Sequence, residues 1–143
     1  MVRASLSLVH PTFAYIRPIH TSSQLFKLHH LQSLGVTVFQ GELDEQDKLV
    51  SCLQQVDVVI STVAVPQHLE QLKLIKAIKQ AGNIKGFVPS EYGNEVDRLQ
   101  GLRPFEDALE NKRKMRRATE EAGIPYTYIS ANSFAAYSIN YLL

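Results

Sequence analysis

Lys112 is the residue in this 143-residue sequence whose surroundings point most directly to chemistry. It opens a basic run, KRKMRR, over residues 112–117. Neighbouring positive charges and partial burial both disfavour the ammonium form, so both lower the pKa of a lysine. A lysine with a lowered pKa can act as a general base near neutral pH. Charge runs on helices are more often solvated, so residue type and spacing alone leave both interpretations open.

Arg17 directly follows a short apolar run at residues 12–16 that has the composition of a β-strand. In doubly wound domains the end of the second strand meets the adenosine ribose of a dinucleotide. An acid there selects NAD, and a cation accommodates the 2′-phosphate of NADP. No acidic residue lies near Arg17, so this position favours NADP. A solvated arginine at a strand end is the alternative.

Two further strand ends carry small and hydroxyl residues. The turn at residues 61–67 follows a buried strand, and its Pro66 is placed to open a helix. Ser90–Gly93 holds the same position one strand further on and begins a long polar segment, residues 91–104. Loops of this length are usually functional, and ligands in such sheets bind at the carboxyl ends of the strands. Plain turns have similar residues, so each pattern alone is weak.

Two constellations of other enzyme classes are missing from the sequence. Ordinary short-chain dehydrogenases use a Tyr-x-x-x-Lys pair, and none of the six tyrosines has a lysine four residues further on. The histidines have no cysteines or paired acids at the spacing of metal ligands, so we expect no metal site. We expect surface or packing positions for all five: His10, His20, His29, His30 and His68.

Short β-branched runs alternate with segments of helical period along the sequence. This order predicts βαβ units and a parallel sheet, hence an α/β fold of the doubly wound type. We expect five parallel strands, the first at Thr12–Ile16 and the last at Tyr126–Ser130, with others at 37–40, 58–62 and 85–90. Helices are expected at residues 25–34, 47–55, 69–81 and 105–122.

Met1–Leu8 is predicted to be the second half of a helix. A doubly wound fold has one more strand and a glycine-rich turn before that helix, and the sequence holds neither. We therefore expect a partial doubly wound parallel sheet, an incomplete NADP-binding domain over residues 1–143. The two strands that flank the lost position must then close the gap, pair with another chain or fail to fold. Self-association through unpaired sheet edges is expected on this basis.

Composition narrows the partners and the compartment. The net charge of +1 provides no electrostatic basis for binding nucleic acid or a membrane. Cys52 is the one cysteine, so no internal disulfide forms, and we expect it on the inner face of a helix. No run approaches the ~18–20 apolar residues of a membrane span. The N-terminus has no long apolar region typical of a signal peptide. A cytoplasmic location is expected.

The order of motifs resembles a known family. Its main carriers are GELDEQDKLVSCLQQVDVVIST, AIKQAGNIKGFVPSEYG and FEDALENKRKMRRATEEAGIPYTYISANSFAAYSINYLL. They resemble the plant isoflavone reductase-like group of NADPH-dependent reductases, atypical NmrA-like members of the short-chain dehydrogenase superfamily. The likeness is greatest to the eugenol and isoeugenol synthases, through RPFEDALENKRK and SFAAYSINYLL. It covers essentially all 143 residues.

The resemblance implies roles for individual residues. Lys112, followed by Arg116 and Arg117, matches the catalytic lysine of the group's K-x-x-x-R-R pattern, and Arg17 matches the arginine that binds the NADP 2′-phosphate. Tyr137 falls where the substrate pocket begins. Seven residues fall where the family lines the cofactor: Pro66, Gln67, Glu91, Tyr92, Gly93, Asn132 and Phe134.

The function that the resemblance implies is NADPH-dependent reduction of a small phenylpropanoid through a quinone methide, with Lys112 as general base. The substrate would be a coniferyl ester, reduced to a eugenol-type phenylpropene, or a benzylic ether. The alternative is a non-catalytic NADP-sensing or interaction module of the NmrA-like type.

Two departures from the family qualify this implication. Family members begin with a strand and a GxTGxxG turn, and they continue into a second half that supplies most of the substrate pocket. We expect the C-terminal substrate domain to be absent here. The chain alone is then expected to bind NADPH weakly and to show no reductase activity.

Overall fold

The computed structural model describes residues 1–132 and divides the chain into two compact units, Met1–Cys52 and Leu53–Leu143. Each unit is described by itself. Within the described part, no helix is both long enough and apolar enough to cross a membrane.

The first unit is a parallel βαβ arrangement. Its two strands pair in register from Phe13 opposite Thr37 to Ile16 opposite Gln40. Parallel strands need a crossover connection, which is usually a helix, and α2 supplies it. The elements are α1 (Val2–Ser7), β1 (Phe13–Ile16), α2 (Ser22–Ser33), β2 (Thr37–Gln40) and α3 (Gln46–Leu53).

Local sequence explains where α2 begins and ends. The Thr21 hydroxyl accepts a hydrogen bond from the Gln24 amide at 3.2 Å, and the Gln24 side chain accepts one from the Thr21 amide at 3.1 Å. This reciprocal capping box satisfies two backbone donors that a helix start leaves free. Beyond the C-terminal end, Gly35 takes the left-handed conformation with φ of 87°, which costs glycine little.

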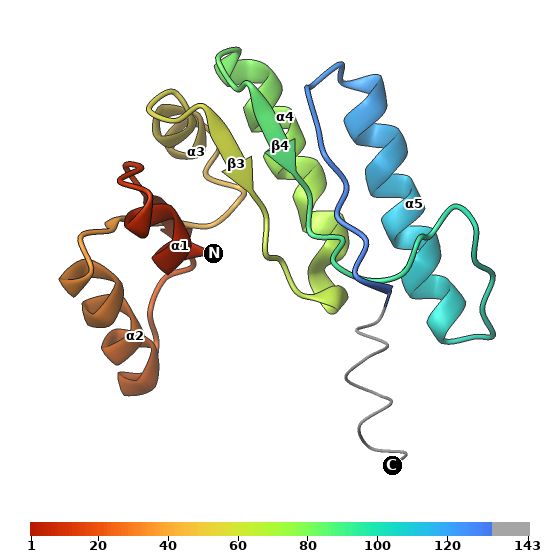
Figure 1. Cartoon of the computed structure of the whole chain (residues 1–143), viewed down its shortest axis with the longest axis horizontal. Helices are drawn as coiled ribbons and strands as arrows, with labels where there is room; N and C mark the ends of the chain where they lie inside the picture. The colour runs from red at the N-terminus through yellow and green to blue at the C-terminus, as the bar shows by residue number, and fades with distance from the viewer. Residues whose placement is uncertain (133–143) are drawn as a thin grey trace. The chain divides into compact units, whose positions relative to one another are not determined.

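The second unit carries the same kind of connection. Strand β3 pairs in parallel with β4, from Val58 opposite Gly86 to Ile60 opposite Val88. The segment before residue 132 runs alongside β4 (Figure 1) and meets it in a parallel bridge between Phe87 and Tyr126. The elements are β3 (Val58–Ile60), the 3₁₀ helix η1 (Val65–Glu70), α4 (Gln71–Ala81), β4 (Gly86–Val88) and α5 (Phe105–Glu121).

The core of the second unit lies between β4 and the helices α4 and α5. Phe87 at the centre of β4 is fully buried, as is Ala77 on α4. The Thr119 hydroxyl on α5 is also buried and donates to the Met115 carbonyl at 2.8 Å. The buried apolar residues of the two helices are Leu74, Ile75, Ala77, Ile78, Leu109 and Met115. The helical spacing of apolar residues in α4 therefore agrees with the face that packs inward.

The predicted parallel α/β architecture is confirmed, with shorter strands than expected. The strands form two separate two-stranded sheets and not one five-stranded sheet. Tyr126–Ser130 is not a strand. The Phe87 amide donates to the Pro125 carbonyl, and the Phe87 carbonyl accepts from the Thr127 amide. Further along, the Ala131 amide donates to the Gly93 carbonyl at 2.9 Å. No strand forms over Tyr126–Ser130, because after the bridge at Tyr126 the segment bonds to the loop and not to β4.

The two strands that were expected to flank a lost strand each keep one partner. Within the first unit β1 pairs with β2, and within the second unit β3 pairs with β4. Self-association through their free edges stays a prediction. Cys52 is buried in α3, as expected.

Phe87→Ala is expected to lower the free energy of unfolding by about 3–5 kcal/mol, because it leaves a cavity at a site with no exposed surface. Phe105→Ala is the matched control in the same unit. Its ring is 52% exposed, so a loss of about 1 kcal/mol is expected. Urea unfolding of both variants measures the difference, and equal losses would contradict this assignment of the core.

Candidate active site

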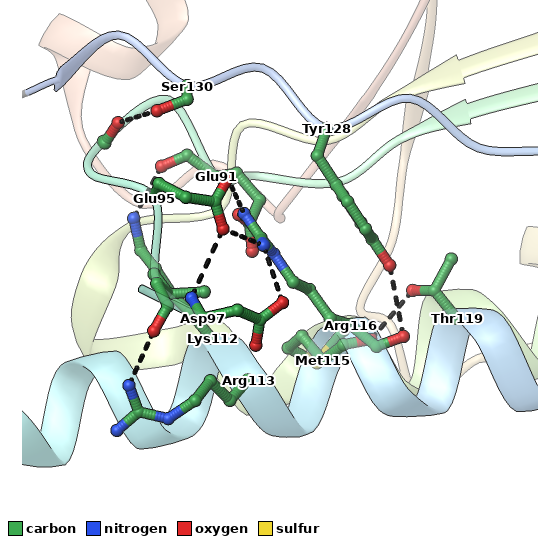
Figure 2. Close-up of polar contacts among 12 residues, drawn as sticks. Glu91, Glu95, Asp97, Lys112, Arg113, Met115, Arg116, Thr119, Tyr128 and Ser130 are labelled. Atoms are coloured by element: carbon green, nitrogen blue, oxygen red, sulfur yellow. Dashed lines mark hydrogen bonds and ion pairs between the residues drawn. The ribbon is translucent and has the colours of Figure 1, made fainter. Parts of the chain in front are cut away.

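The candidate site forms where the loop after β4 crosses the basic face of α5. Lys112 and Arg116 lie one turn apart on the helix, and so do Arg113 and Arg117. Side chains at this spacing lie on one side of a helix. Figure 2 shows the Lys112 and Arg116 side chains extending from α5 toward the loop that carries Glu91.

Lys112 is half-buried, and its Nζ donates a hydrogen bond to the Glu91 carbonyl at 2.6 Å. Burial lowers the pKa of Lys112 below its ordinary value. The Glu91 carboxylate opposes this shift, and the Arg116 charge adds to it. The direction agrees with the prediction made from the basic run, although burial contributes more than the neighbouring charges. The side chain is held in place by a main-chain acceptor and has a lowered pKa, the two properties that a general base needs.

Gly93 provides the space that the Lys112 ammonium occupies. A Cβ atom at Gly93 would lie 3.0 Å from Lys112 Nζ, so any larger residue would crowd it. The Gly93 carbonyl accepts hydrogen bonds from the amides of Ala131, at 2.9 Å, and Asn132, at 3.0 Å. Lys112, Gly93 and Asn132 are therefore brought together at the carboxyl end of β4, where ligands bind in α/β sheets.

Arg116 is buried and surrounded by acceptors. Its Nε and Nη2 donate to Glu91 Oε2 at 2.9 and 2.6 Å, and Nη1 donates to Asp97 Oδ2 at 2.9 Å and to Glu95. Its guanidinium carbon lies 4.6 Å from the centre of the Tyr128 ring. Burial opposes the charge, but the hydrogen bonds to these carboxylates outweigh it and raise the pKa of Arg116. Burial also raises the pKa of Tyr128.

Two more arginines of α5 hold the same loop. Arg113 Nη1 donates to the Val96 carbonyl at 2.8 Å and to the Leu99 carbonyl at 3.2 Å. Arg117 pairs with Asp97 at 2.7 Å. The basic run is therefore not wholly solvated, because three of its arginines bind the loop. The sequence shows acids at positions 91, 95 and 97 and cations at i and i+4, but it does not show which of them pair.

Polar side chains from the segment after β3 also lie near the loop. Gln71 is buried; its Oε1 accepts from the Ser90 amide at 2.8 Å, and its Nε2 donates to the His68 carbonyl at 3.3 Å. The 3₁₀ helix η1 begins at Val65, and Pro66 lies in its first turn, in agreement with the prediction that Pro66 opens a helix; Gln67 lies within η1. The Ser61 Oγ is buried and has no hydrogen-bond partner among the described residues.

His68 is a functional candidate, although the sequence predicts only a surface or packing position for it. It is buried on η1, which packs against α5, and its Nδ1 has no hydrogen-bond partner within residues 1–132. Burial and the nearby Lys112 charge both lower the pKa of His68. A single histidine within an apolar and amide-rich run has no spacing pattern that could have revealed this.

The structure brings together some of the predicted site residues and leaves others apart. Glu91, Tyr92, Gly93, Asn132 and Lys112 gather around the loop, and Pro66 and Gln67 lie in the same unit. Arg17 is exposed directly after β1 in the first unit. Phe134 and Tyr137 lie outside the described residues. No three His, Cys, Asp or Glu side chains in the described part are placed to hold a metal ion.

Parallel βαβ connections with the candidate residues at the carboxyl ends of the strands are features of a Rossmann-like nucleotide-binding fold. The backbone superimposes on a crystal structure from a study of pinoresinol-lariciresinol and phenylcoumaran benzylic ether reductases, with a TM-score of 0.87 and 46% identity over 92% of this chain and 44% of that chain. It matches the leucoanthocyanidin reductase–NADPH complex from Vitis vinifera with a TM-score of 0.86 and 36% identity, over 92% of this chain and 45% of that chain.

The model of the NmrA-like family matches residues 1–143, and the chain belongs to this family. It is 62% identical to isoeugenol synthase 1 of Petunia hybrida, over all of this chain and 45% of that protein. It is 48% identical to the phenylcoumaran benzylic ether reductase Betv6 of Betula pendula, over 96% of this chain and 45% of that protein. The chain thus spans about half the length of these curated relatives.

His68 is expected to make stability depend on pH just below neutrality. Its folded-state pKa lies below the ordinary 6.5, so the unfolded chain binds the proton more readily. The contribution of His68 to the free energy of unfolding is therefore fully present above pH 6.5. It falls, by up to ~1.4 kcal/mol per pH unit, as the pH drops toward the folded-state pKa.

In His68→Leu this pH-dependent loss is expected to disappear. Urea unfolding at several values between about pH 5 and pH 7.5 measures it. Exposed His29→Leu is the control and should keep the wild-type profile. A His68→Leu profile as steep as that of the wild type would show that folding does not lower the pKa of His68.

Proposed function

We propose that this chain forms the cofactor-side half of an NADPH-dependent reductase that acts on a phenylpropanoid. The observation that carries the proposal is Lys112, half-buried at the carboxyl end of β4 with a lowered pKa and an Nζ held by the Glu91 carbonyl. The 62% identity to isoeugenol synthase 1 of Petunia hybrida supports the substrate class, as does a related structure that holds NADP⁺ and pinoresinol.

The residues present fit NADPH at two places. Arg17 is an exposed cation directly after β1, without a hydrogen bond or ion pair to another described residue, and so is free to meet a phosphate. The buried Ser61 Oγ has no partner in the described part, as expected of a group whose partner is a ligand. When bound, NADPH would supply the hydride of the reaction.

Lys112 would hold and move one proton. In its neutral form it takes the proton of the substrate's phenol group. The phenolate electrons then expel a carboxylate from the side chain of a coniferyl ester, or open a benzylic ether, and leave a quinone methide. After reduction the product is again a phenolate, and Lys112 returns the proton to it. Burial at Lys112 favours this chemistry because it lowers the cost of the neutral amine.

The second candidate is a non-catalytic NADP-sensing module, in keeping with the family to which the chain belongs. A sensor has no use for a lysine with a lowered pKa held over a glycine. The two functions therefore differ in what a change at Lys112 should do.

Lys112→Ala is expected to abolish turnover, a loss of 10²-fold or more for a general base, and to leave NADPH binding nearly unchanged. The test uses a chimera in which these 143 residues replace the aligned segment of the Petunia hybrida relative, assayed with coniferyl esters. Lys114→Ala is the control, because Lys114 is exposed on the same helix. Full turnover without Lys112 would exclude it as the base, and absence of turnover in the unsubstituted chimera would favour the sensor.

Arg17→Ala is expected to weaken NADPH binding by about one to two powers of ten, since a charge-assisted hydrogen bond contributes roughly 1.5–3 kcal/mol. NADH has no 2′-phosphate, so its affinity should change little. Calorimetry on the same chimera measures both constants, with Lys79→Ala as an exposed control cation on α4. Equal losses for the two cofactors would assign Arg17 a structural role.

A further inference from the structure

Glu91 contacts two cations of α5 through two different groups. Its main-chain carbonyl accepts from Lys112 Nζ at 2.6 Å. Its carboxylate Oε2 accepts from Arg116 Nε at 2.9 Å and from Arg116 Nη2 at 2.6 Å. Figure 2 shows the Glu91 carboxylate meeting the Arg116 guanidinium in the space between the loop and α5. Whatever fixes the Glu91 side chain therefore also fixes the acceptor that holds Lys112.

The Glu91–Arg116 pair is buried, and Arg116 has further contacts. Its side chains are only 4% and 5% exposed. Asp97 accepts a further hydrogen bond from Arg116 at 2.9 Å, and the Tyr128 ring lies against the guanidinium. Removing one partner of a buried ion pair leaves an uncompensated charge. The arrangement of this pair is thus strongly determined by its surroundings.

The backbone next to Glu91 has an unfavourable conformation that other contacts must hold. Tyr92 has a φ of 38°, in the left-handed region that residues other than glycine rarely adopt. This conformation follows directly after the Glu91 carbonyl and helps to set its direction. Backbone of this kind persists only where the surrounding structure holds it. The buried pair provides that hold on the preceding residue.

Three charged or titratable groups face Lys112, one from each neighbouring element. Glu91 on the loop raises its pKa, and Arg116 on its own helix lowers it, in addition to the larger effect of burial. His68 on η1 is the third, and burial lowers the pKa of His68, which favours its neutral form. The paired Glu91 and Arg116 thus act on the pKa of Lys112 in opposite directions.

We propose that the Glu91–Arg116 ion pair positions Lys112, fixing where its Nζ lies and keeping the local charge beside it balanced. Neither residue of the pair is assigned a proton-transfer step; both act through Lys112. The importance of the pair for turnover rests on the proposed function, but the ionisation of Lys112 is measurable without turnover.

The test follows the ionisation of Lys112 by NMR in the 143-residue protein with ¹³Cε-labelled lysine, the Lys112 signal being assigned by its loss in Lys112→Arg. Arg116→Gln removes the cation and leaves the Glu91 carboxylate unpaired, so the pKa of Lys112 should rise by about one unit. Glu91→Gln keeps the main-chain acceptor and leaves Arg116 unpaired, so the pKa should fall by a similar amount. The double variant should lie near the wild type.

Opposite signs separate positioning by a balanced pair from a merely structural role. If the pair only held the loop closed, either substitution would admit water to Lys112 and raise its pKa in both variants, which would overturn the proposal. No shift in either variant would overturn it as well. Arg117→Gln is the control, because Arg117 is 53% exposed and shares Asp97 without contacting Glu91; it should leave Lys112 unchanged.

The Glu91→Gln variant alone and the pH dependence of kcat/KM provide two further tests. If Arg116→Gln fails to fold, Glu91→Gln alone decides: a lowered pKa supports the proposal, and a raised or unchanged one overturns it. In the chimera, the acidic limb of kcat/KM against pH should move with the NMR titration. If the titration moves as expected and the kinetic limb does not, the positioning inference stands and the proposed role of Lys112 as base fails.

Discussion

The buried Arg116 guanidinium is the constraint on which the candidate site depends. A charge removed from water must be paired and hydrogen-bonded, or it destabilises the fold by several kcal/mol. Packing α5 against η1 and α4 takes Arg116 out of solvent, and the carboxylates of Glu91, Glu95 and Asp97 compensate it. The loop after β4 must therefore cross α5 at this point. The hydrogen bond between the Glu91 carbonyl and Lys112 is a consequence of that crossing.

The same loop explains an irregularity of the sheet. Gly93 lacks the side chain that would crowd Lys112 Nζ, and its carbonyl accepts the amides of Ala131 and Asn132. These contacts draw residues 130–132 away from β4 after a single bridge at Tyr126. A longer strand would have left Asn132 farther along the β4 ladder. The geometry that shortens the strand is thus the geometry that gathers the candidate site.

The second unit holds most of the candidate site residues, and they follow the ends of its strands. In doubly wound domains, ligands bind beyond the carboxyl ends of the strands because loops and helix N-termini meet there. Ser61, Ser90 and the loop from Glu91 all follow such strand ends. Arg17 follows the corresponding end of β1 in the first unit. The NmrA-like family match spans both units.

Sequence periodicity determined the main helices, the parallel character of the strands and the inward face of α4, because these depend on neighbours within one or two turns. It also pointed to Lys112, since six consecutive residues carry the basic run, and to Pro66 at the start of η1. Only the tertiary structure decided how the strands group into sheets, where the last strand stops, and that His68 is buried beside Lys112. It also decided that Arg116 binds Glu91, 25 residues away in sequence. Partners so distant are chosen by the path of the loop between them, and no local spacing encodes that path.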